Sequence, residues 1–585
     1  MRKIFEGRFG WLLATMLLIG LIYFSNWFPL RADLTAEKRF TITNATKKIL
    51  NDLDSTITIQ VFLTGDLPAD YRKLNQSVQD LLAEFKNLSG GTLLKISFEK
   101  PGESIKNDTA KVLLYDSLAQ LGIVFEQSAT RSSETEKATQ QLIIPSALVS
   151  YKNQKPIAVD LRSSKKLFKQ YNVLTATEGP QEDVEATRNA AEALLEYKFA
   201  NAIDKLTRKN IPTVAYTVGN GEPIDLKVND LGESLRNEYR LAVFDLKKGY
   251  PDASMIDAMM IVKPTQPFTE EDKLKIDQYL MHGGKIIWFV DKLYAELDSL
   301  KRSQASYTAF DRGLDLDDLL FKYGVRINGD LIQDLNCSKI PIVIGQNPDG
   351  SPTMQRVPWP YYPFLSAHGD NPITKNLDRV LPLFPSSIDT VKAPGIVKTI
   401  LLSTDSNSRS LSSPAMVSVN SVHGEEDMRS FTKSYIPVAV LLEGKFNSFF
   451  NNRVSRNLSD SILRATGKIY LSKAEKPGKQ IVVADADIVT NEVTQTKGAL
   501  QMGLLAMENY RFANREFFLN SIDYLISTNN LFESRNKEFV LRLLDKKKLQ
   551  LQRTKWQFIN IGLPIAFVLF LGTIYQWKRK KQFSA

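Results

Sequence analysis

The stretch GKIIWFVD, residues 284–291, decides the fold of this chain. Every residue from Ile286 to Val290 is apolar, so a strand formed here is apolar on both faces and needs cover on both. Strands of this kind belong to parallel sheets that carry helices on each face. The stretch therefore predicts the buried centre of a doubly wound α/β sheet.

Strands and helices alternate on either side of this stretch. Apolar strands are predicted at Pro212–Thr217, Ala258–Lys263 and Lys479–Val489. Helical patterns lie at 231–237, 269–281 and 514–526. The helix at 269–281 has Thr269 as its N-cap and three acids in its first turn, where the helix dipole favours negative charge. This alternation predicts a doubly wound domain over residues 210–530.

Two further regions of the body have different patterns. A strand at Ile57–Pro68 and amphipathic helices at Tyr71–Leu88 and Glu182–Lys209 predict a first α/β domain over residues 32–209. Residues 301–478 are loop-rich and are predicted to be a mixed insertion in the second domain. Its aromatic run at 359–362 is assigned to a core or a subdomain interface in preference to a sugar-binding platform.

An uncharged apolar stretch lies near each end of the chain, at Phe9–Leu30 and at Phe558–Trp577. A helix rises about 1.5 Å per residue, so about 20 apolar residues cross the roughly 30 Å hydrocarbon core of a bilayer. We expect one transmembrane helix at each end, within residues 1–31 and 557–585. Residues 531–556 are expected to form a helical stalk beside the membrane.

Positive charge concentrates beside these stretches. Residues 1–31 carry a net charge of +3 and residues 532–585 a net charge of +9, within a total of +10. Basic residues in short flanks mark the cytoplasmic side, which predicts cytoplasmic termini and an extracytoplasmic body. In this orientation, the basic residues between 542 and 555 lie on the extracytoplasmic side of the membrane, against the rule. Long domains translocate largely regardless of charge, so the short terminal flanks decide the predicted orientation. The basic flanks are expected to meet anionic lipid headgroups, and no nucleic-acid partner is expected.

Sequence motifs of common catalytic sites are missing from the chain. It has no GxxxxGK[ST], HExxH, CxxC or GxSxG pattern. The single cysteine, Cys337, excludes an intramolecular disulfide and a cysteine metal cluster. The three histidines, at 282, 368 and 423, are far apart in sequence. We therefore expect a protein that is not an enzyme and has no resident metal or cofactor.

The best candidate binding site combines a glycine-bearing loop with acids at strand ends. In open α/β sheets, ligands bind beyond the carboxyl ends of the strands. The loop of Gly219, Asn220, Gly221 and Glu222 is predicted to follow one strand, Asp291 to end another, and Asp485 and Asp487 to lie near the end of a third. Such positions would bring the acids together at one edge of the sheet. The alternative interpretation is structural: the glycines form a tight turn, and the acids cap helices or accept hydrogen bonds from loop backbone. The sequence favours this structural interpretation.

Several stretches over nearly the whole chain resemble the GldG family, the gliding-motility-associated ABC transporter auxiliary proteins of Bacteroidetes-type bacteria. They are RADLTAEKRFTIT (31–43), VFLTGDLP (61–68), GNGEP (219–223), VAVLLEGKFNSFFNNR (438–453), VVADADIV (482–489), NREFFLNSIDYL (514–525) and LLDKKK (543–548). The family often has a histidine between the two loop glycines, where this chain has Asn220. That departure weakens any acid–base role for the loop.

The resemblance implies a location, partners and a fold. The location is the bacterial inner membrane, with a large periplasmic body. The partners are a permease, GldF, and a cytoplasmic ATPase, GldA, and the resemblance is compatible with an oligomer inside the transporter. The second domain would resemble amidotransferase-like, intraflagellar-transport-like or flavodoxin-like α/β domains without catalytic residues. The family has no established catalytic set to carry over.

Two functions remain open at this point. In the first, the chain is a non-catalytic accessory subunit of an ABC transporter for gliding motility, acting as a substrate-binding or coupling module. In the second, it is a membrane-anchored periplasmic enzyme or glycan-binding protein that acts on the cell envelope through the strand-end loops. The first interpretation is favoured.

Overall fold

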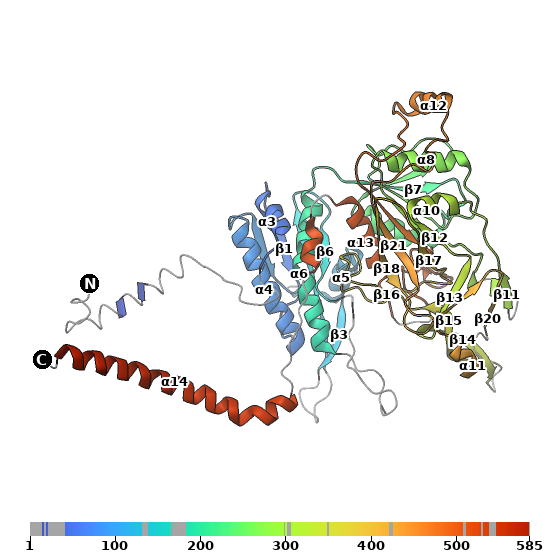
Figure 1. Ribbon diagram of the computed structural model, residues 1–585. Coiled ribbons are helices and arrows are strands. Elements are labelled where there is room, and N and C mark those ends of the chain that lie inside the picture. Colours follow the sequence, from blue (N-terminus) through green and yellow to red (C-terminus); the bar gives the residue numbers. More distant parts are fainter. Residues whose placement is uncertain are drawn as a thin grey trace. The chain divides into compact units, whose positions relative to one another are not determined.

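The computed structural model of the chain has two compact units, residues 1–538 and 539–585, which are described separately (Figure 1). The described residues are 15–16, 19–20, 41–103, 105–130, 139–163, 165, 183–297, 299–300, 306–347, 350, 352–419, 425–506, 510–527, 530–536 and 546–583.

The second domain is built on an eight-stranded sheet with the order β16-β18-β21-β22-β10-β9-β7-β8. Five neighbouring strands run parallel: β22 (Gly478–Val483), β10 (Ile286–Phe289), β9 (Ala258–Val262), β7 (Thr213–Val218) and β8 (Arg240–Asp245). Their order along this part of the sheet is that of a flavodoxin-like, doubly wound fold. All four residues of β10 are buried, as the stretch at 284–291 predicted.

Helices cover both faces of this sheet and form two separate cores. On one face, Val214, Met260 and Phe289 pack with residues of α7 (Asn229–Arg236) and α13 (Asn514–Ile526). On the other face, Met259 and Trp288 pack with residues of α8 (Glu270–Met281) and α10 (Asp317–Tyr323). The Thr269 side chain accepts a hydrogen bond from the Asp272 backbone N–H and completes a capping box at the start of α8. The predicted N-cap is confirmed.

The sheet is mixed, and the segment predicted as an insertion supplies its antiparallel strands. These are β21 (Pro437–Gly444), β18 (Ile396–Ser403) and β16 (Ser366–Ala367). The middle of β21 is buried throughout, because the strand lies inside the sheet between β22 and β18. A continuous apolar run, VAVLL at 438–442, therefore marks a central strand that the sequence analysis left inside the insertion.

The rest of this segment forms small antiparallel pairs around an aromatic core. The pairs are β11 (Ser306–Ala309) with β20 (Ala415–Ser418), β12 (Val325–Ile327) with β17 (Ile388–Thr390), β13 (Asp330–Asp334) with β19 (Ser408–Ser412), and β14 (Cys337–Gln346) with β15 (Pro352–Pro363). Trp359, Tyr361 and Tyr362 are buried together with Phe384, which confirms their assignment to a core. Short elements nearby are α11 (Glu425–Arg429), α12 (Arg456–Thr466), η1 (Leu226–Val228), β23 (Val493–Thr494) and β24 (Gly498–Ala499).

The first domain has a four-stranded sheet with the order β2-β1-β5-β6. Its strands are β1 (Ile57–Val61), β2 (Leu94–Phe98), β5 (Ser146–Tyr151) and β6 (Ile157–Asp160), and β3 (Glu126–Thr130) and β4 (Thr139–Ile143) pair as a hairpin. Its helices are α3 (Asn44–Asn51), α4 (Ala69–Leu88), α5 (Asp108–Gln120) and α6 (Val184–Thr207). Leu531 and Phe532 of the 3-10 helix η2 (Asn530–Asn536) are buried in the same core, although the sequence analysis placed them in the stalk.

A buried ionic cluster joins helix α6 to the second domain. The Lys205 ammonium lies 3.0 Å from an Asp523 carboxylate oxygen and 2.5 Å from a Glu238 carboxylate oxygen. The Tyr239 hydroxyl and the Asn201 amide also donate to Asp523. We call Lys205, Asp523, Glu238, Tyr239 and Asn201 the domain-joint cluster.

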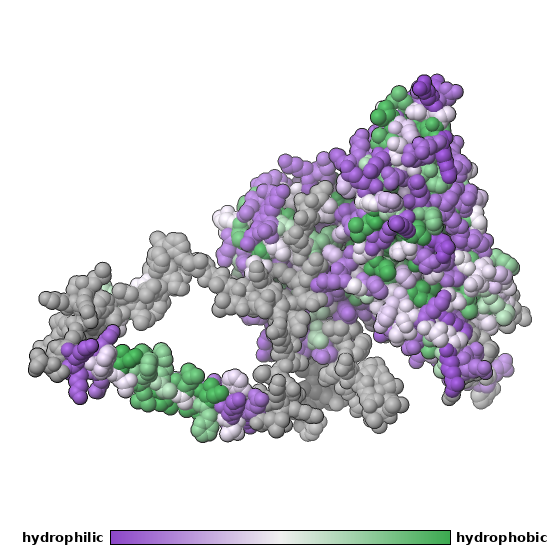
Figure 2. Space-filling model, viewed as in Figure 1, coloured by the Kyte–Doolittle hydropathy of each residue, from purple (hydrophilic) through white to green (hydrophobic). Residues whose placement is uncertain are grey.

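The second unit contains α14 (Lys546–Phe583), the one helix in the described part of the chain that is long and apolar enough to cross a membrane. Within Gln552–Lys581, an 18-residue window has a mean hydropathy of 2.0 and contains no buried residue. Figure 2 shows its apolar middle in green between polar ends in purple. Of the N-terminal apolar stretch, only Thr15, Met16, Ile19 and Gly20 are described, all as helix, so the predicted first span lies outside the described residues.

Candidate functional site at the strand-end edge

The predicted site residues all lie at one edge of the sheet in the second domain. Strands β7, β9, β10 and β22 are parallel, so their carboxyl ends share that edge. The loop at 219–222 follows β7, Asp291 comes two residues after β10, and Asp485 and Asp487 follow β22. The expected convergence of the strand-end acids is therefore observed for the three aspartates.

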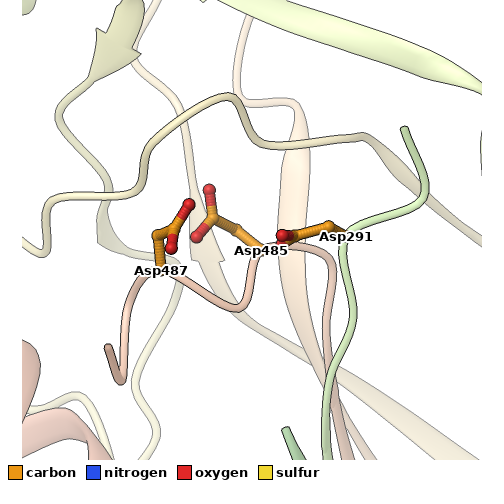
Figure 3. Close-up of side chains that lie close together, drawn as sticks. All are labelled: Asp291, Asp485 and Asp487. Atoms are coloured by element: carbon orange, nitrogen blue, oxygen red, sulfur yellow. The ribbon is translucent and has the colours of Figure 1, made fainter. Parts of the chain in front are cut away.

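The three aspartates form a compact group (Figure 3). One carboxylate oxygen from each of Asp291, Asp485 and Asp487 lies within 4.8 Å of the others. Asp291 and Asp485 are buried, whereas Asp487 is half-buried. We call these three residues the aspartate cluster.

Backbone groups hold two of the three carboxylates in place. Asp291 accepts a hydrogen bond of 2.7 Å from the Ala486 N–H. Asp485 accepts from the Ile488 N–H at 3.1 Å and from the Leu383 N–H at 2.8 Å. Leu383 belongs to the predicted insertion, so that segment contacts the sheet edge. The structural interpretation of the sequence predicted that the acids accept such hydrogen bonds from loop backbone.

Two cations complete the cluster, and the sequence analysis named neither of them. The Lys263 ammonium lies 3.2 Å from Asp291 Oδ2 and 2.5 Å from Asp487 Oδ1. The Arg312 guanidinium lies 3.7 Å from Asp291 Oδ2 and 3.3 Å from Glu296. Lys263 follows the apolar strand β9 directly, which is a signal that could have found it. Its φ of 48° lies in the left-handed region, which for a residue other than glycine is strained by about 1–3 kcal/mol.

Burial and like charges govern the protonation of the aspartate cluster. Burial raises the pKa of Asp485 well above its ordinary value, and the charges of Asp487 and Asp291 add to the increase. Burial also raises the pKa of Asp291, and it outweighs the opposing charge of Lys263. Burial alone would lower the pKa of Lys263, but Asp291 and Asp487 outweigh it and raise that pKa. Lys263 therefore stays charged while Asp485 favours its protonated form.

The glycine-bearing loop forms a separate part of the edge, next to the connection between β9 and α8. The Thr265 and Gln266 N–H groups donate to the Asn220 carbonyl oxygen at 2.9 Å each. Gly221 has a φ of +80°, and an added Cβ would collide with the Thr265 hydroxyl, so this position requires glycine. The loop thus contacts residues 265–266, whereas Lys263, two residues earlier, contacts the aspartate cluster.

Asn220 and Glu222 are buried in this loop, and each has an oxygen atom that makes no hydrogen bond. The Asn220 backbone N–H donates to Glu222 Oε2 at 2.7 Å, and the Asn220 amide nitrogen donates to the Pro267 carbonyl at 3.1 Å. Asn220 Oδ1 and Glu222 Oε1 are left without a partner. Burial raises the pKa of Glu222. The loop lies between β7 and β9, where the strand order reverses and doubly wound folds bind ligands.

The single cysteine and the two described histidines lie in the following surroundings. Burial raises the pKa of the Cys337 thiol to about 12, so the reactive thiolate is not formed near neutral pH. Burial lowers the pKa of His282, whose ring nitrogen Nε2 is 3.0 Å from the Ile469 carbonyl oxygen. His368 Nδ1 lies 3.1 Å from the Ser403 hydroxyl, and His423 lies outside the described residues.

Two family descriptions match the chain. Residues 211–521 match the family described as an ABC-type uncharacterized transport system, and residues 36–150 match a domain of unknown function, DUF7088. This chain belongs to the ABC-type transport system auxiliary family. The family match covers the eight-stranded sheet and the strand-end edge, and it associates this auxiliary protein with an ABC transport system. Comparison with curated proteins gives no match.

Two solved structures resemble parts of this auxiliary protein. The mmIFT52 N-terminal domain is 12% identical, with 54% of this chain and 98% of that chain covered and a TM-score of 0.29. The exo-beta-1,4-mannosidase Op5Man5 from Opitutaceae bacterium strain TAV5 is 11% identical, with 50% and 34% covered and a TM-score of 0.20. Both scores are too low to support an argument about fold or activity.

Proposed function

We propose that this protein is a non-catalytic accessory subunit of an ABC transporter that serves bacterial gliding motility. The observation that carries the proposal is the family match over residues 211–521, which contains the whole parallel sheet. The resemblance of stretches such as 482–489 and 514–525 to the GldG family adds the gliding system. A GldF-type permease and a GldA-type ATPase are the proposed partners.

The proposed topology anchors the body at both ends, with α14 as the second span. Basic residues 578–581 follow the apolar part of α14 and would face the cytoplasm, where they would also meet anionic lipids. The body would lie in the periplasm of the inner membrane. A chain fixed at two points suits a coupling subunit better than a receptor that must diffuse with its ligand.

The arrangement of the strand-end edge supports a role without catalysis. Lys263 and Arg312 oppose the charge of the aspartates, and Asp485 is fixed by two backbone N–H groups. A general base needs a free carboxylate or imidazole within reach of substrate. At this edge the carboxylate of Asp291 is instead ion-paired and buried.

A glycan-binding or enzymatic role at the switch-point loop is the second candidate. The observation in its favour is the pair of unpartnered buried oxygen atoms, Asn220 Oδ1 and Glu222 Oε1. A ligand with hydroxyl or amino donors would satisfy both. Glu222→Gln separates the two functions, because it removes the carboxylate charge and retains a side-chain oxygen for the Asn220 N–H.

The test is complementation of a deletion strain, scored by gliding on agar. The accessory-subunit proposal expects loss of gliding on deletion and full recovery with wild type, with Glu222→Gln and with Cys337→Ser. Normal gliding of the deletion strain would contradict the gliding assignment. Failure of a folded Glu222→Gln protein to restore gliding would move the assignment to the second candidate.

The topology can be tested separately by thiol labelling in a Cys337→Ser background. Asp66→Cys places a thiol on the exposed surface of the body, and Lys578→Cys places one beyond the apolar part of α14. A membrane-impermeant maleimide applied to spheroplasts should label the first thiol and label the second only after lysis. Labelling of both thiols, or of the second alone, would contradict the proposed orientation.

A further inference from the structure

We propose that a surface cavity beside helix α10 binds an acidic oligosaccharide, a short chain of sugars that carry carboxylates. The cavity has a volume of about 900 Å³, within the range of about 300–1,000 Å³ that is typical of small-molecule sites. Residues of α10, of β12 and of the segment 449–453 line it, together with Lys292 and Asp311. We call it the α10 cavity, and none of the site residues predicted from the sequence lines it.

The acids that line the α10 cavity are already paired with two buried lysines. Lys292 Nζ lies 3.0 Å from Asp311 Oδ2 and 2.7 Å from Asp317 Oδ2. Lys273 Nζ lies 3.1 Å from Asp318 Oδ2. Each of these three carboxylates therefore has an ammonium partner within the protein, so the acids do not single out the cavity as a site for a cation.

Two basic side chains of the cavity wall, in contrast, have no acidic partner. Lys322 and Arg453 are exposed, and neither forms an ion pair within the described part of the chain. The Arg453 guanidinium carbon lies 4.7 Å from the centre of the Phe449 ring. Stacking on the ring leaves the guanidinium N–H groups available, and a guanidinium binds a carboxylate through two parallel hydrogen bonds. The unpaired charges of the wall are thus positive.

Arg326 of β12 supplies a third cation. The strand alternates in burial, so Arg326 points outward while Val325 and Ile327 are buried. Its guanidinium lies 2.6 Å from an Asp389 carboxylate oxygen, and the two side chains are 54% and 50% exposed. An ion pair this exposed contributes little to stability, so Arg326 can exchange Asp389 for a ligand carboxylate at small cost.

An exposed aromatic ring favours a sugar over a bare anion. Phe321, in the wall of the α10 cavity, is 53% exposed. The C–H groups on one face of a sugar ring pack well against such an aromatic face. The amide of Asn451, which is also exposed, offers donors and an acceptor for sugar hydroxyls. Most residues that line the cavity are charged or carry an amide, which suits a ligand with many hydroxyls better than one with apolar side chains.

The test is calorimetric titration of the purified full chain in detergent with trigalacturonate, at about 0.15 M salt to screen exposed charges. We expect saturable binding of one molecule per chain. The methyl ester of the same trisaccharide lacks the charges and should bind at least about tenfold more weakly, because it forms no charge-assisted hydrogen bonds. The purified chain contains neither a permease nor an ATPase, so the result does not depend on the proposed function.

A matched pair of lysine variants tests the location of the site. Lys322→Gln and Arg453→Gln should each weaken trigalacturonate binding at least about tenfold. Lys73→Gln removes the same charge from an exposed lysine of α4 and should leave binding unchanged. Circular dichroism confirms that each variant is folded. If Lys322→Gln does not fold, Arg453→Gln decides.

Three results would contradict the proposal. Absence of saturable binding of trigalacturonate to wild type would overturn it. Equal binding of the methyl ester, or an equal loss from Lys73→Gln, would also overturn it, because the carboxylates or the α10 cavity would then not be recognised. Triglutamate is the peptide comparison, and tighter binding of triglutamate than of trigalacturonate would overturn the assignment to a carbohydrate.

Discussion

The domain-joint cluster and the strand-end edge each bury one lysine between two carboxylates, yet their electrostatics differ. At the joint, burial alone would raise the pKa of Asp523, but Lys205 and the Tyr239 hydroxyl outweigh it and lower that pKa. At the edge, burial and neighbouring carboxylates raise the pKa of Asp485 well above its usual range. The joint thus favours the charged form of Asp523, whereas the edge favours the protonated form of Asp485.

The difference shows that two buried clusters of one lysine and several carboxylates can favour opposite protonation states of an aspartate. A buried ion pair whose hydrogen bonds are all made fixes two elements in one arrangement, and breaking it leaves an uncompensated charge. A cluster in which burial and neighbouring carboxylates raise the pKa of one carboxyl group instead favours a bound proton on that group. We assign the joint to holding α6 against the second domain.

The largest expected difference concerns the two lysines. Lys205→Met should lower the free energy of unfolding by about 3–5 kcal/mol, because Asp523 stays buried without its ammonium. Lys263→Met should lower it by only about 1–2 kcal/mol, because an aspartate with a raised pKa can take up a proton in place of the lost cation. Urea unfolding of the full chain in detergent measures both values. Equal losses at the two sites would remove the distinction between the clusters.

The two tyrosines provide a matched pair with a smaller expected effect. Tyr239→Phe removes a hydroxyl that donates to the Asp523 carboxylate and should cost about 1.5–3 kcal/mol of unfolding free energy. Tyr362→Phe removes a hydroxyl without a partner and should change stability by less than about 0.5 kcal/mol. The same unfolding experiment applies. A large loss of unfolding free energy for Tyr362→Phe would show that the Tyr362 hydroxyl makes a hydrogen bond.

Much of the fold could be predicted from local patterns. The apolar strands at 258–263 and 286–290, the capped helix after Thr269, and the placement of Asp291, Asp485 and Asp487 at one edge all follow from periodicity and from the rule that parallel strands end together. Strand β21 was recognisable as an apolar run, but its antiparallel pairing with β22 depends on tertiary structure. The N-terminal span stays a prediction.

The partners within each cluster could not be predicted, because they lie far apart in sequence. Lys205 and Asp523 are 318 positions apart, and Lys263 and Asp487 are 224 positions apart. No periodicity connects such residues, and the sequence around each lysine does not identify its acidic partners. The unpartnered state of Tyr362 likewise depends on how the aromatic core packs over the edge, which composition does not reveal.

The smallest expected effects are in the pH dependence of stability, and the two clusters should give opposite signs. Because the folded pKa of Asp485 is raised, the folded state holds the extra proton, and stability decreases as pH rises from about 4 through that folded pKa. Because the folded pKa of Asp523 is lowered, its contribution is present above about pH 4 and is lost as pH falls through the folded value.

Unfolding free energies of Asp485→Asn and Asp523→Asn across pH 3–8 separate these two contributions. In Asp485→Asn, the decrease in stability as pH rises above about 4 should be absent. In Asp523→Asn, the decrease in stability as pH falls below about 4 should be smaller than in wild type. The comparison uses the slope of the unfolding free energy against pH, because each substitution also perturbs hydrogen bonds and so shifts that free energy at every pH. Identical profiles for both variants and wild type would show that neither carboxyl has a shifted pKa.

The central claim, that this auxiliary protein works as a subunit of an ABC transporter, is tested most directly by copurification. The tagged full chain would be extracted from native membranes in mild detergent, and its bound proteins would be identified and quantified by mass spectrometry. We predict a permease and an ATPase in near-stoichiometric amounts with the chain. Recovery of the intact, folded chain with neither of them would contradict the account.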